Sequence, residues 1–219
     1  MPPKLLVSVS FLRINDTTVP KKIFYLSLYQ TTLIIVCFAT LITGFILSDF
    51  SLITVFQNSH SSKPFFYKFS GSWGNHEGSL LLWLLVLSVF LYIFLLKSSS
   101  QNIKYRLLTL LFQQIIISGF LIFILLTSNP FNTVFPIPSE GLGLNPILQD
   151  PALAIHPPIL YFGYVGTSII FSTSLAALVA GNIGDSWAKH IKSWVLVSWI
   201  FLTIGILLGS IWAYYELGW

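Results

Sequence analysis

Few side chains in this sequence could do chemistry, and one histidine stands out among them. His156 is followed by Pro157 and Pro158, which carry no backbone N–H. Proline disfavours helical backbone at the residue before it and fits well in the first turn of a helix. We therefore expect His156 to be extended, at the mouth of an apolar helix. An imidazole on such stiff backbone can bind a ligand; the alternative is an interfacial histidine that hydrogen-bonds a loop carbonyl.

A second histidine lies in the stretch Trp73–Ser79, which reads WGNHEGS and comes directly before an apolar run. Glu77, near the expected helix start, can accept hydrogen bonds from free amides and interact with the helix dipole. His76 is then an interface anchor, a ligand, or a partner of a ligand.

Aromatic residues gather where the last apolar run ends: Trp212, Tyr214, Tyr215 and Trp219. Aromatic side chains are enriched at membrane interfaces, and that enrichment alone would explain them.

The composition is that of an integral membrane protein. Of the 219 residues, 55% are hydrophobic and only 8% are charged, whereas about a quarter are charged in an ordinary soluble domain. The net charge of +4 does not indicate nucleic-acid binding, because the basic residues stand in short groups beside the apolar runs. The one cysteine, Cys37, cannot form a disulfide or a cysteine-based zinc site within this chain, and it reads as a small packing residue.

Five apolar runs approach or exceed the roughly 20 residues needed to cross a bilayer. We expect an all-α membrane protein with a polar N-terminal lead (1–22) and a five-helix membrane domain (23–219). The predicted spans are about 23–47, 80–96, 107–127, 159–180 and 195–215. Two long connections, 48–79 and 128–158, join the first to the second span and the third to the fourth.

The basic residues predict the topology. Of the 11 Lys and Arg residues, all but Lys63 and Lys68 fall on one side of the predicted spans. By the positive-inside rule the N-terminus lies inside, whereas the C-terminus and both long connections lie outside. No charged residue falls within the body of a span, which weighs against an ion-coupled transporter. Small residues at helical spacing, such as Gly205 with Gly209, indicate close helix packing instead.

Three stretches resemble one known family. They are LNPILQDPALAIHPPILYFGYVG around His156, WGNHEGSLLLW from Trp73, and WIFLTIGILLGSIWAYYELGW at the C-terminus. Together they resemble the CcmF-type cytochrome c haem lyases, membrane proteins of cytochrome c maturation. The long proline-rich stretch is the most specific of the three.

The resemblance implies a haem-handling role. In CcmF-type proteins the histidine of the HPP motif is one of two that ligate an incoming haem on the outer face, and His156 matches it. The second of those histidines lies beyond the motif at which this chain ends. The resemblance also places Trp212, Tyr215 and Trp219 at the edge of a tryptophan-rich haem platform, and leaves His76 as a candidate partner of the ligand.

By the same resemblance the chain is the N-terminal portion of a haem lyase, a subunit incomplete without the segment after Trp219. That segment would follow in a longer chain or stand on a split partner polypeptide. The implied partners are the haem chaperone CcmE and apocytochrome c, and the implied location is the inner membrane of a bacterium or a mitochondrion. The alternatives are a related lyase for another c-type cytochrome and a non-catalytic scaffold subunit of the maturation complex.

Overall fold

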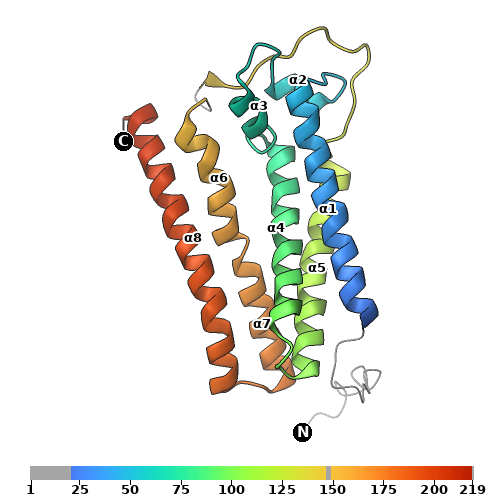
Figure 1. Cartoon of the computed structure of the whole chain (residues 1–219), viewed down its shortest axis with the longest axis vertical. Helices are drawn as coiled ribbons and strands as arrows, with labels where there is room; N and C mark the ends of the chain where they lie inside the picture. Colours follow the sequence, from blue (N-terminus) through green and yellow to red (C-terminus); the bar gives the residue numbers. More distant parts are fainter. Residues whose placement is uncertain (1–20, 147–148, 219) are drawn as a thin grey trace.

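The computed structural model describes residues 21–146 and 149–218, and these fold into helices joined by turns and loops (Figure 1). In chain order the helices are α1 (Lys21–Leu47), α2 (Ile53–Asn58), α3 (Phe65–Gly71), α4 (His76–Lys97), α5 (Ile103–Thr127), α6 (Pro151–Tyr164), α7 (Thr167–Ala180) and α8 (Asp185–Leu217). Most of the polar lead predicted for residues 1–22 lies outside the described residues, as does Trp219.

Five helical segments are long and apolar enough to cross a membrane: α1, α4, α5, the α6–α7 stretch and α8. The prediction of an all-α integral membrane protein with five spans is confirmed. The helices extend past the predicted spans, most clearly in α8, which runs from Asp185 to Leu217. A hydropathy run marks only the apolar part of a helix, whereas the helix continues through polar residues until a cap ends it.

Local caps explain where several helices begin. The side chain of Asn75 accepts a hydrogen bond from the Gly78 amide at the start of α4. Asn102 does the same for the Lys104 amide at the start of α5. Asparagine is among the preferred N-cap residues because its side-chain oxygen satisfies an otherwise unpaired amide. Asn75, not the predicted Glu77, therefore caps α4.

The fourth span consists of two helices. The chain turns between α6 and α7 at Val165 and Gly166. A Cβ on Gly166 would lie 2.3 Å from the Phe162 carbonyl oxygen and 2.9 Å from the ring of Phe90 on α4. Only glycine fits at this position. The turn between α6 and α7 therefore packs directly against α4.

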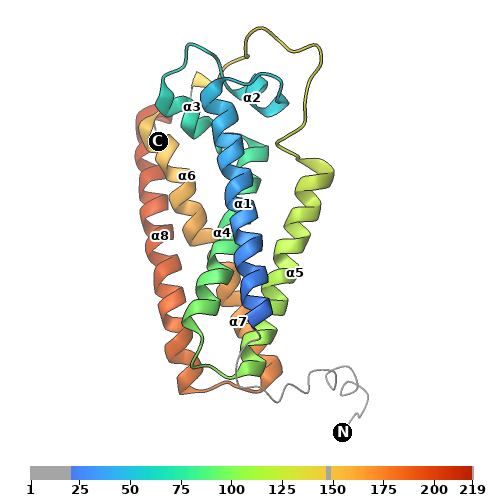
Figure 2. The same cartoon turned by 45° about the vertical axis from the view of Figure 1, so that its right-hand side comes forward.

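Helix α4 forms the centre of the bundle, and 56% of its most apolar window is buried. It packs against α1, α5, α6 and α7 (Figure 2). A buried amide ties α5 to α7: Gln113 donates to the hydroxyl of Ser168 at 2.9 Å and accepts from the hydroxyl of Ser172 at 2.8 Å. Such hydrogen bonds hold helices together in a bilayer, where water cannot replace them.

The two ends of the bundle differ in composition. One end, here called the loop end, carries α2, α3 and the proline-rich connection between α5 and α6 (Figure 1). The other end, here called the basic end, carries Lys97, Lys104, Arg106, Lys189 and Lys192. Helix α1 begins at the basic end and α8 finishes at the loop end (Figure 2). Which end faces the cytoplasm stays a prediction.

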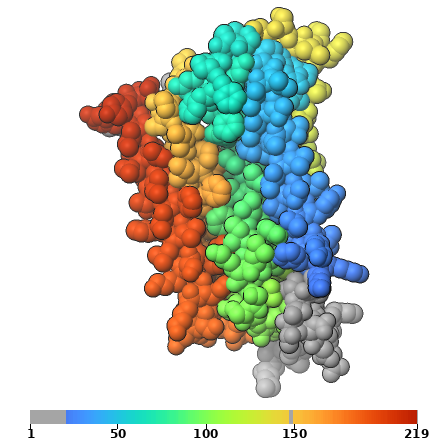
Figure 3. Space-filling model, in the orientation of Figure 1, coloured from blue at the N-terminus to red at the C-terminus, as the bar shows by residue number. Residues whose placement is uncertain are grey.

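Helices α6 and α8 lie side by side (Figure 3). Their backbones come close together at two glycines. A Cβ on Gly163 of α6 would lie 2.4 Å from the Leu202 nitrogen of α8, and one on Gly205 of α8 would lie 2.8 Å from the Cα of Leu160. The close packing predicted from the spacing of Gly205 and Gly209 is therefore present. This pair of helices positions the principal candidate residue.

Candidate functional site

The helix that carries His156 begins earlier than the sequence predicts. Helix α6 starts at Pro151, and the side chain of Asp150 caps it by accepting a hydrogen bond from the Leu153 amide at 2.9 Å. His156 thus lies inside a helix, and the prediction that it is extended and precedes one is wrong. The N-cap and a proline in the first helical position already satisfy the helix start, so Pro157 and Pro158 fall in the second turn.

The imidazole of His156 points toward α8. Its Nδ1 lies 2.6 Å from the carbonyl oxygen of Gly205. A carbonyl only accepts hydrogen bonds, so Nδ1 carries the proton and Nε2 of a neutral ring keeps its lone pair. Nε2 makes no hydrogen bond to any described residue. It is also not buried, because it is absent from the buried polar atoms that lack a partner. The ring is therefore fixed in one tautomer with Nε2 free.

Gly209 makes room for this ring. A Cβ on Gly209 would lie 2.7 Å from Cε1 and 2.9 Å from Nδ1 of His156. Gly205 and Gly209 are one turn apart on α8, so one supplies the acceptor while the other leaves the space that the imidazole fills. Metal-binding histidines commonly donate their second ring N–H to a carbonyl in this way, which orients the ring and raises its basicity.

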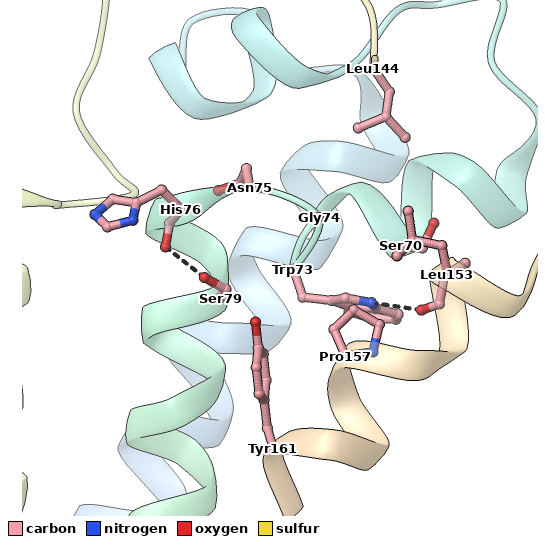
Figure 4. A pocket seen from close by; sticks show the side chains of 11 residues that line it. Ser70, Trp73, Gly74, Asn75, His76, Ser79, Leu144, Leu153, Pro157 and Tyr161 are labelled. Atoms are coloured by element: carbon pink, nitrogen blue, oxygen red, sulfur yellow. Dashed lines mark hydrogen bonds between the residues drawn. The ribbon is translucent and has the colours of Figure 1, made fainter. Parts of the chain in front are cut away.

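The prolines of α6 leave carbonyls that no helical amide can reach. Pro157 and Pro158 cannot donate to the carbonyls of Leu153 and Ala154, four residues earlier. The indole Nε1 of Trp73 donates to the Ala154 carbonyl at 2.9 Å. This bond, drawn in Figure 4, joins the WGNHEGS stretch to the helix of His156. Two motifs far apart in the sequence are thus parts of one structure.

A pocket of about 310 Å³ lies where these motifs meet (Figure 4). Trp73 and Pro157 form one part of its wall, and the ring of Tyr161 rises beside them toward Ser79. Leu144 of the proline-rich connection closes the upper side in this view. The pocket mixes aromatic, apolar and hydroxyl groups with the amide of Asn75 and the imidazole of His76. His156 does not line it, since its ring faces α8.

His76 is placed differently from His156. It is the first residue of α4, it is exposed, and its Nε2 lies 3.1 Å from the hydroxyl of Ser128 at the end of α5. In Figure 4 its ring points away from Trp73 and Pro157. No contact joins it to His156 among the described residues. The structure thus places His76 as a link between the ends of α4 and α5.

The aromatic residues at the end of α8 lie beyond Gly209 on the same helix. Trp212 is half-buried, whereas Tyr214 and Tyr215 are exposed and their rings meet edge to face with centroids 5.5 Å apart. Trp219 lies outside the described residues. Trp212 follows Gly209 by three residues, so both lie on neighbouring positions of one helix face.

The loop end is held together by a carboxylate outside the membrane-spanning helices. Glu140 accepts hydrogen bonds from the hydroxyl and the amide of Ser61 and from the Gly141 amide, and it lies 3.9 Å from His60. These donors, with the Ser61 hydroxyl first, lower the pKa of Glu140 to about 2. The contact pins the proline-rich connection to the segment between α2 and α3.

The described residues include single side chains that could bind a metal ion, but no cluster of them that could enclose one. No group of three or more His, Cys, Asp or Glu side chains in residues 21–146 and 149–218 could hold a metal ion. A haem iron needs only axial ligands from the protein, because the porphyrin supplies the other four. The free Nε2 of His156 fits one such position, and these residues offer no second histidine beside it.

Two contacts of the candidate site were not predicted from the sequence: the packing of the His156 ring against Gly209 and the hydrogen bond from Trp73 to Ala154. The second had a signal in the sequence. Adjacent prolines inside a helix always leave two carbonyls in need of donors, and an indole N–H in a nearby motif is a candidate donor.

The chain matches known proteins over most of its length. The family model for the cytochrome C assembly protein matches residues 73–219. Similar proteins include the cytochrome c-type biogenesis protein ccl1 of Rhodobacter capsulatus, 50% identical over 193 residues, which are 88% of this chain and 30% of that protein. The cytochrome c-type biogenesis protein CycK of Rhizobium meliloti is 52% identical over 184 residues, 83% of this chain and 27% of that protein.

A solved structure described as the cytochrome c haem lyase CcmF superposes on 87% of this chain with a TM-score of 0.72 and 25% identity, covering 30% of that structure's chain. The chain therefore spans under a third of the length of these relatives.

Proposed function

The chain belongs to the cytochrome c assembly protein family, and on that basis we propose that it is a component of a cytochrome c-type haem lyase. Such a component takes part in the covalent attachment of haem to apocytochrome c at the outer face of an energy-transducing membrane. In this proposal the loop end is the outer end. The membrane is the inner membrane of a bacterium or a mitochondrion, and the two similar proteins described above are bacterial.

One observation carries the proposal: the hydrogen bond from Nδ1 of His156 to the Gly205 carbonyl at 2.6 Å. This bond fixes the tautomer in which Nε2 can bind iron. The close packing of the ring against Gly209 fixes the orientation of the ring plane. Haem is the substrate here, and His156 binds its iron from one side. The second axial ligand and most of the surface around the porphyrin belong to the part of the lyase that this chain does not span.

The contribution of this chain to the reaction is positioning. In that reaction each of the two cysteine thiols of apocytochrome c adds across the C=C bond of a haem vinyl group, so that sulfur bonds to one vinyl carbon as a thioether and the thiol proton goes to the other. His156 orients the iron and so sets the plane of the porphyrin, while Trp73 and the proline-bearing helix α6 hold His156 in place. The proposal also assigns Trp212 and Tyr215 of α8, together with Trp219, to the edge of the haem platform.

The proposal includes partners. The haem chaperone CcmE delivers haem to the loop end, apocytochrome c receives it, and the remaining portion of the lyase completes the site. The chain itself offers one cysteine, Cys37, which lies within the membrane-spanning helix α1. The reacting thiol pair therefore comes from the partner cytochrome.

The test is replacement of His156 by Ala in the complete assembly, with captured haem and holocytochrome yield as measurements. We expect captured haem to fall about 10-fold or more, because losing even an outer partner of a metal ligand costs about that much in metal affinity. The protein must accumulate normally in the membrane, since a folding defect would mimic a lost ligand. A stable His156→Ala assembly with normal captured haem and normal yield would remove His156 from the site and favour a scaffold role. Testing yield with two different apocytochromes distinguishes this lyase from one dedicated to another cytochrome.

A further inference from the structure

We propose that the basic end of the bundle binds one anionic phospholipid in a pocket between α4 and α8. The pocket has a volume of about 380 Å³ and lies away from the His156 region, at the opposite end of the helices. This inference does not depend on the proposed haem chemistry.

The pocket contains polar groups that lack partners in the protein. Lys97, His190 and Ser193 line it. Lys97 forms no ion pair and Ser193 no hydrogen bond among the described residues. His190 contributes the edge of its ring, which packs on Phe94 and Tyr105, while its Nε2 is buried away from the pocket. Lys97 and Ser193 are exposed, so a ligand in the pocket can reach their ammonium and hydroxyl groups and accept hydrogen bonds from them.

The rest of the wall is apolar and lies deeper in the bundle. It consists of Phe90 and Ile93 on α4 and Val197 on α8. Phe90 is seven residues from Lys97, and Val197 is seven residues from His190, which corresponds to about 10 Å along each helix axis. Trp194 lies between the polar and the apolar part, as aromatic residues do at a membrane interface. The pocket is thus polar toward the helix ends and apolar toward the membrane centre.

An amphiphile with a negatively charged head fits this gradient. No carboxylate lines the pocket. Among the described residues at the basic end, Asp185 is the only acidic one. The basic residues there outnumber it: Lys21, Lys22, Lys97, Lys104, Arg106, Lys189 and Lys192. Basic pockets between transmembrane helices bind the head groups of anionic lipids. The phosphate would accept hydrogen bonds from Lys97 and Ser193, while an acyl chain covers Phe90, Ile93 and Val197.

The test is a lipid titration of the purified 219-residue chain, with bound molecules counted by native mass spectrometry. Phosphatidylglycerol is compared with phosphatidylcholine of the same acyl chains. We expect one phosphatidylglycerol site, several-fold tighter than any phosphatidylcholine site. Lys97→Gln should weaken it about fivefold, whereas Lys104→Gln, which removes the same charge from the same end outside the pocket, should change it less than about twofold.

A second pair of variants tests the apolar half. Val197→Trp fills the pocket and should abolish the tight site, whereas Val195→Trp, on an exposed face of α8 outside the pocket, should not. Excess inorganic phosphate is added as a competitor. If it displaces phosphatidylglycerol and Val197→Trp has no effect, the site is one for free phosphate and the proposal is wrong. Equal binding of the two lipids, or equal effects of Lys97→Gln and Lys104→Gln, would also overturn it.

Discussion

His156 and His76, the two histidines considered for haem binding, differ in the group that hydrogen-bonds the ring. His156 donates to a backbone carbonyl, which can only accept, so its tautomer is fixed. His76 pairs with the hydroxyl of Ser128, which can donate or accept, so either tautomer fits. His156 is also half-buried against α8, whereas His76 is exposed. A histidine is prepared for iron when its second nitrogen is committed elsewhere, and only His156 meets that condition.

The largest effect expected from a residue that is not itself a ligand is that of Gly209→Ala. The new Cβ would lie 2.7 Å from Cε1 of His156, so the ring must leave the Gly205 carbonyl. We expect haem capture by the assembly to fall about 10-fold or more, as when other outer partners of metal-binding histidines are lost. Gly119→Ala on α5 is the matched control, because its Cβ would meet nothing within 4 Å. Equal haem capture by the two variants would show that the packing of the His156 ring against Gly209 does not contribute to haem binding.

The next effect is that of Trp73→Phe, which removes the donor to the Ala154 carbonyl but keeps an aromatic ring. A buried acceptor left unpaired costs about 1–3 kcal/mol of stability. We expect this loss in the unfolding free energy measured in mild detergent, together with a partial loss of haem capture. Trp83→Phe provides the control, since the indole nitrogen of Trp83 is buried without a partner. If Trp83→Phe destabilises the protein as much as Trp73→Phe, the bond to α6 has no special role.

A smaller effect is expected from His76→Ala. The residue is exposed, and a neutral hydrogen bond of this kind contributes roughly 1 kcal/mol or less. Haem capture and holocytochrome yield should stay well above those of the His156→Ala assembly. A loss as large as that of His156→Ala would erase the difference between the two histidines and make His76 a second essential residue.

The smallest effect concerns the pH dependence of the loop end. The pKa of Glu140 lies near 2 in the folded protein, below its ordinary value of 4.5. A carboxyl group with a lowered pKa stabilises the folded loop fully above pH 4.5, and this contribution is lost as the pH falls toward 2. Proteolysis of the proline-rich connection should therefore increase across this window in the wild type. In Glu140→Gln the susceptibility should be nearly flat over the same window, and an unchanged pH profile would contradict the assignment.

The five spans could be predicted because long apolar runs without charge have one structural meaning in a membrane protein. The helix around His156 could not. Local backbone preference places a residue before proline outside a helix, yet the cap of Asp150 and the bond from Trp73 hold α6 helical through both prolines. Neither contact can be located in space from the spacing of residues.

The residues of the candidate site could be predicted from the sequence, but their arrangement in space could not. The HPP motif singled out His156, and the spacing of Gly205 and Gly209 indicated a packed helix. The two features meet in the structure, where the imidazole of His156 fills the space beside Gly209. This contact depends on how α6 and α8 cross, which the sequence does not show. The same spacing occurs in many membrane helices that bind no ligand, so the pattern alone could not predict this contact.

The central claim is that Nε2 of His156 is an axial ligand of haem iron, and the nitrogen ligand itself can be observed. Pulsed electron paramagnetic resonance of the ferric haem-loaded assembly should show an axial nitrogen that His156→Gly loses. Isotopically labelled imidazole added to that variant should restore the signal with the label's own coupling, because it occupies the vacated position. An unchanged axial nitrogen signal in a stable His156→Gly assembly would contradict the claim.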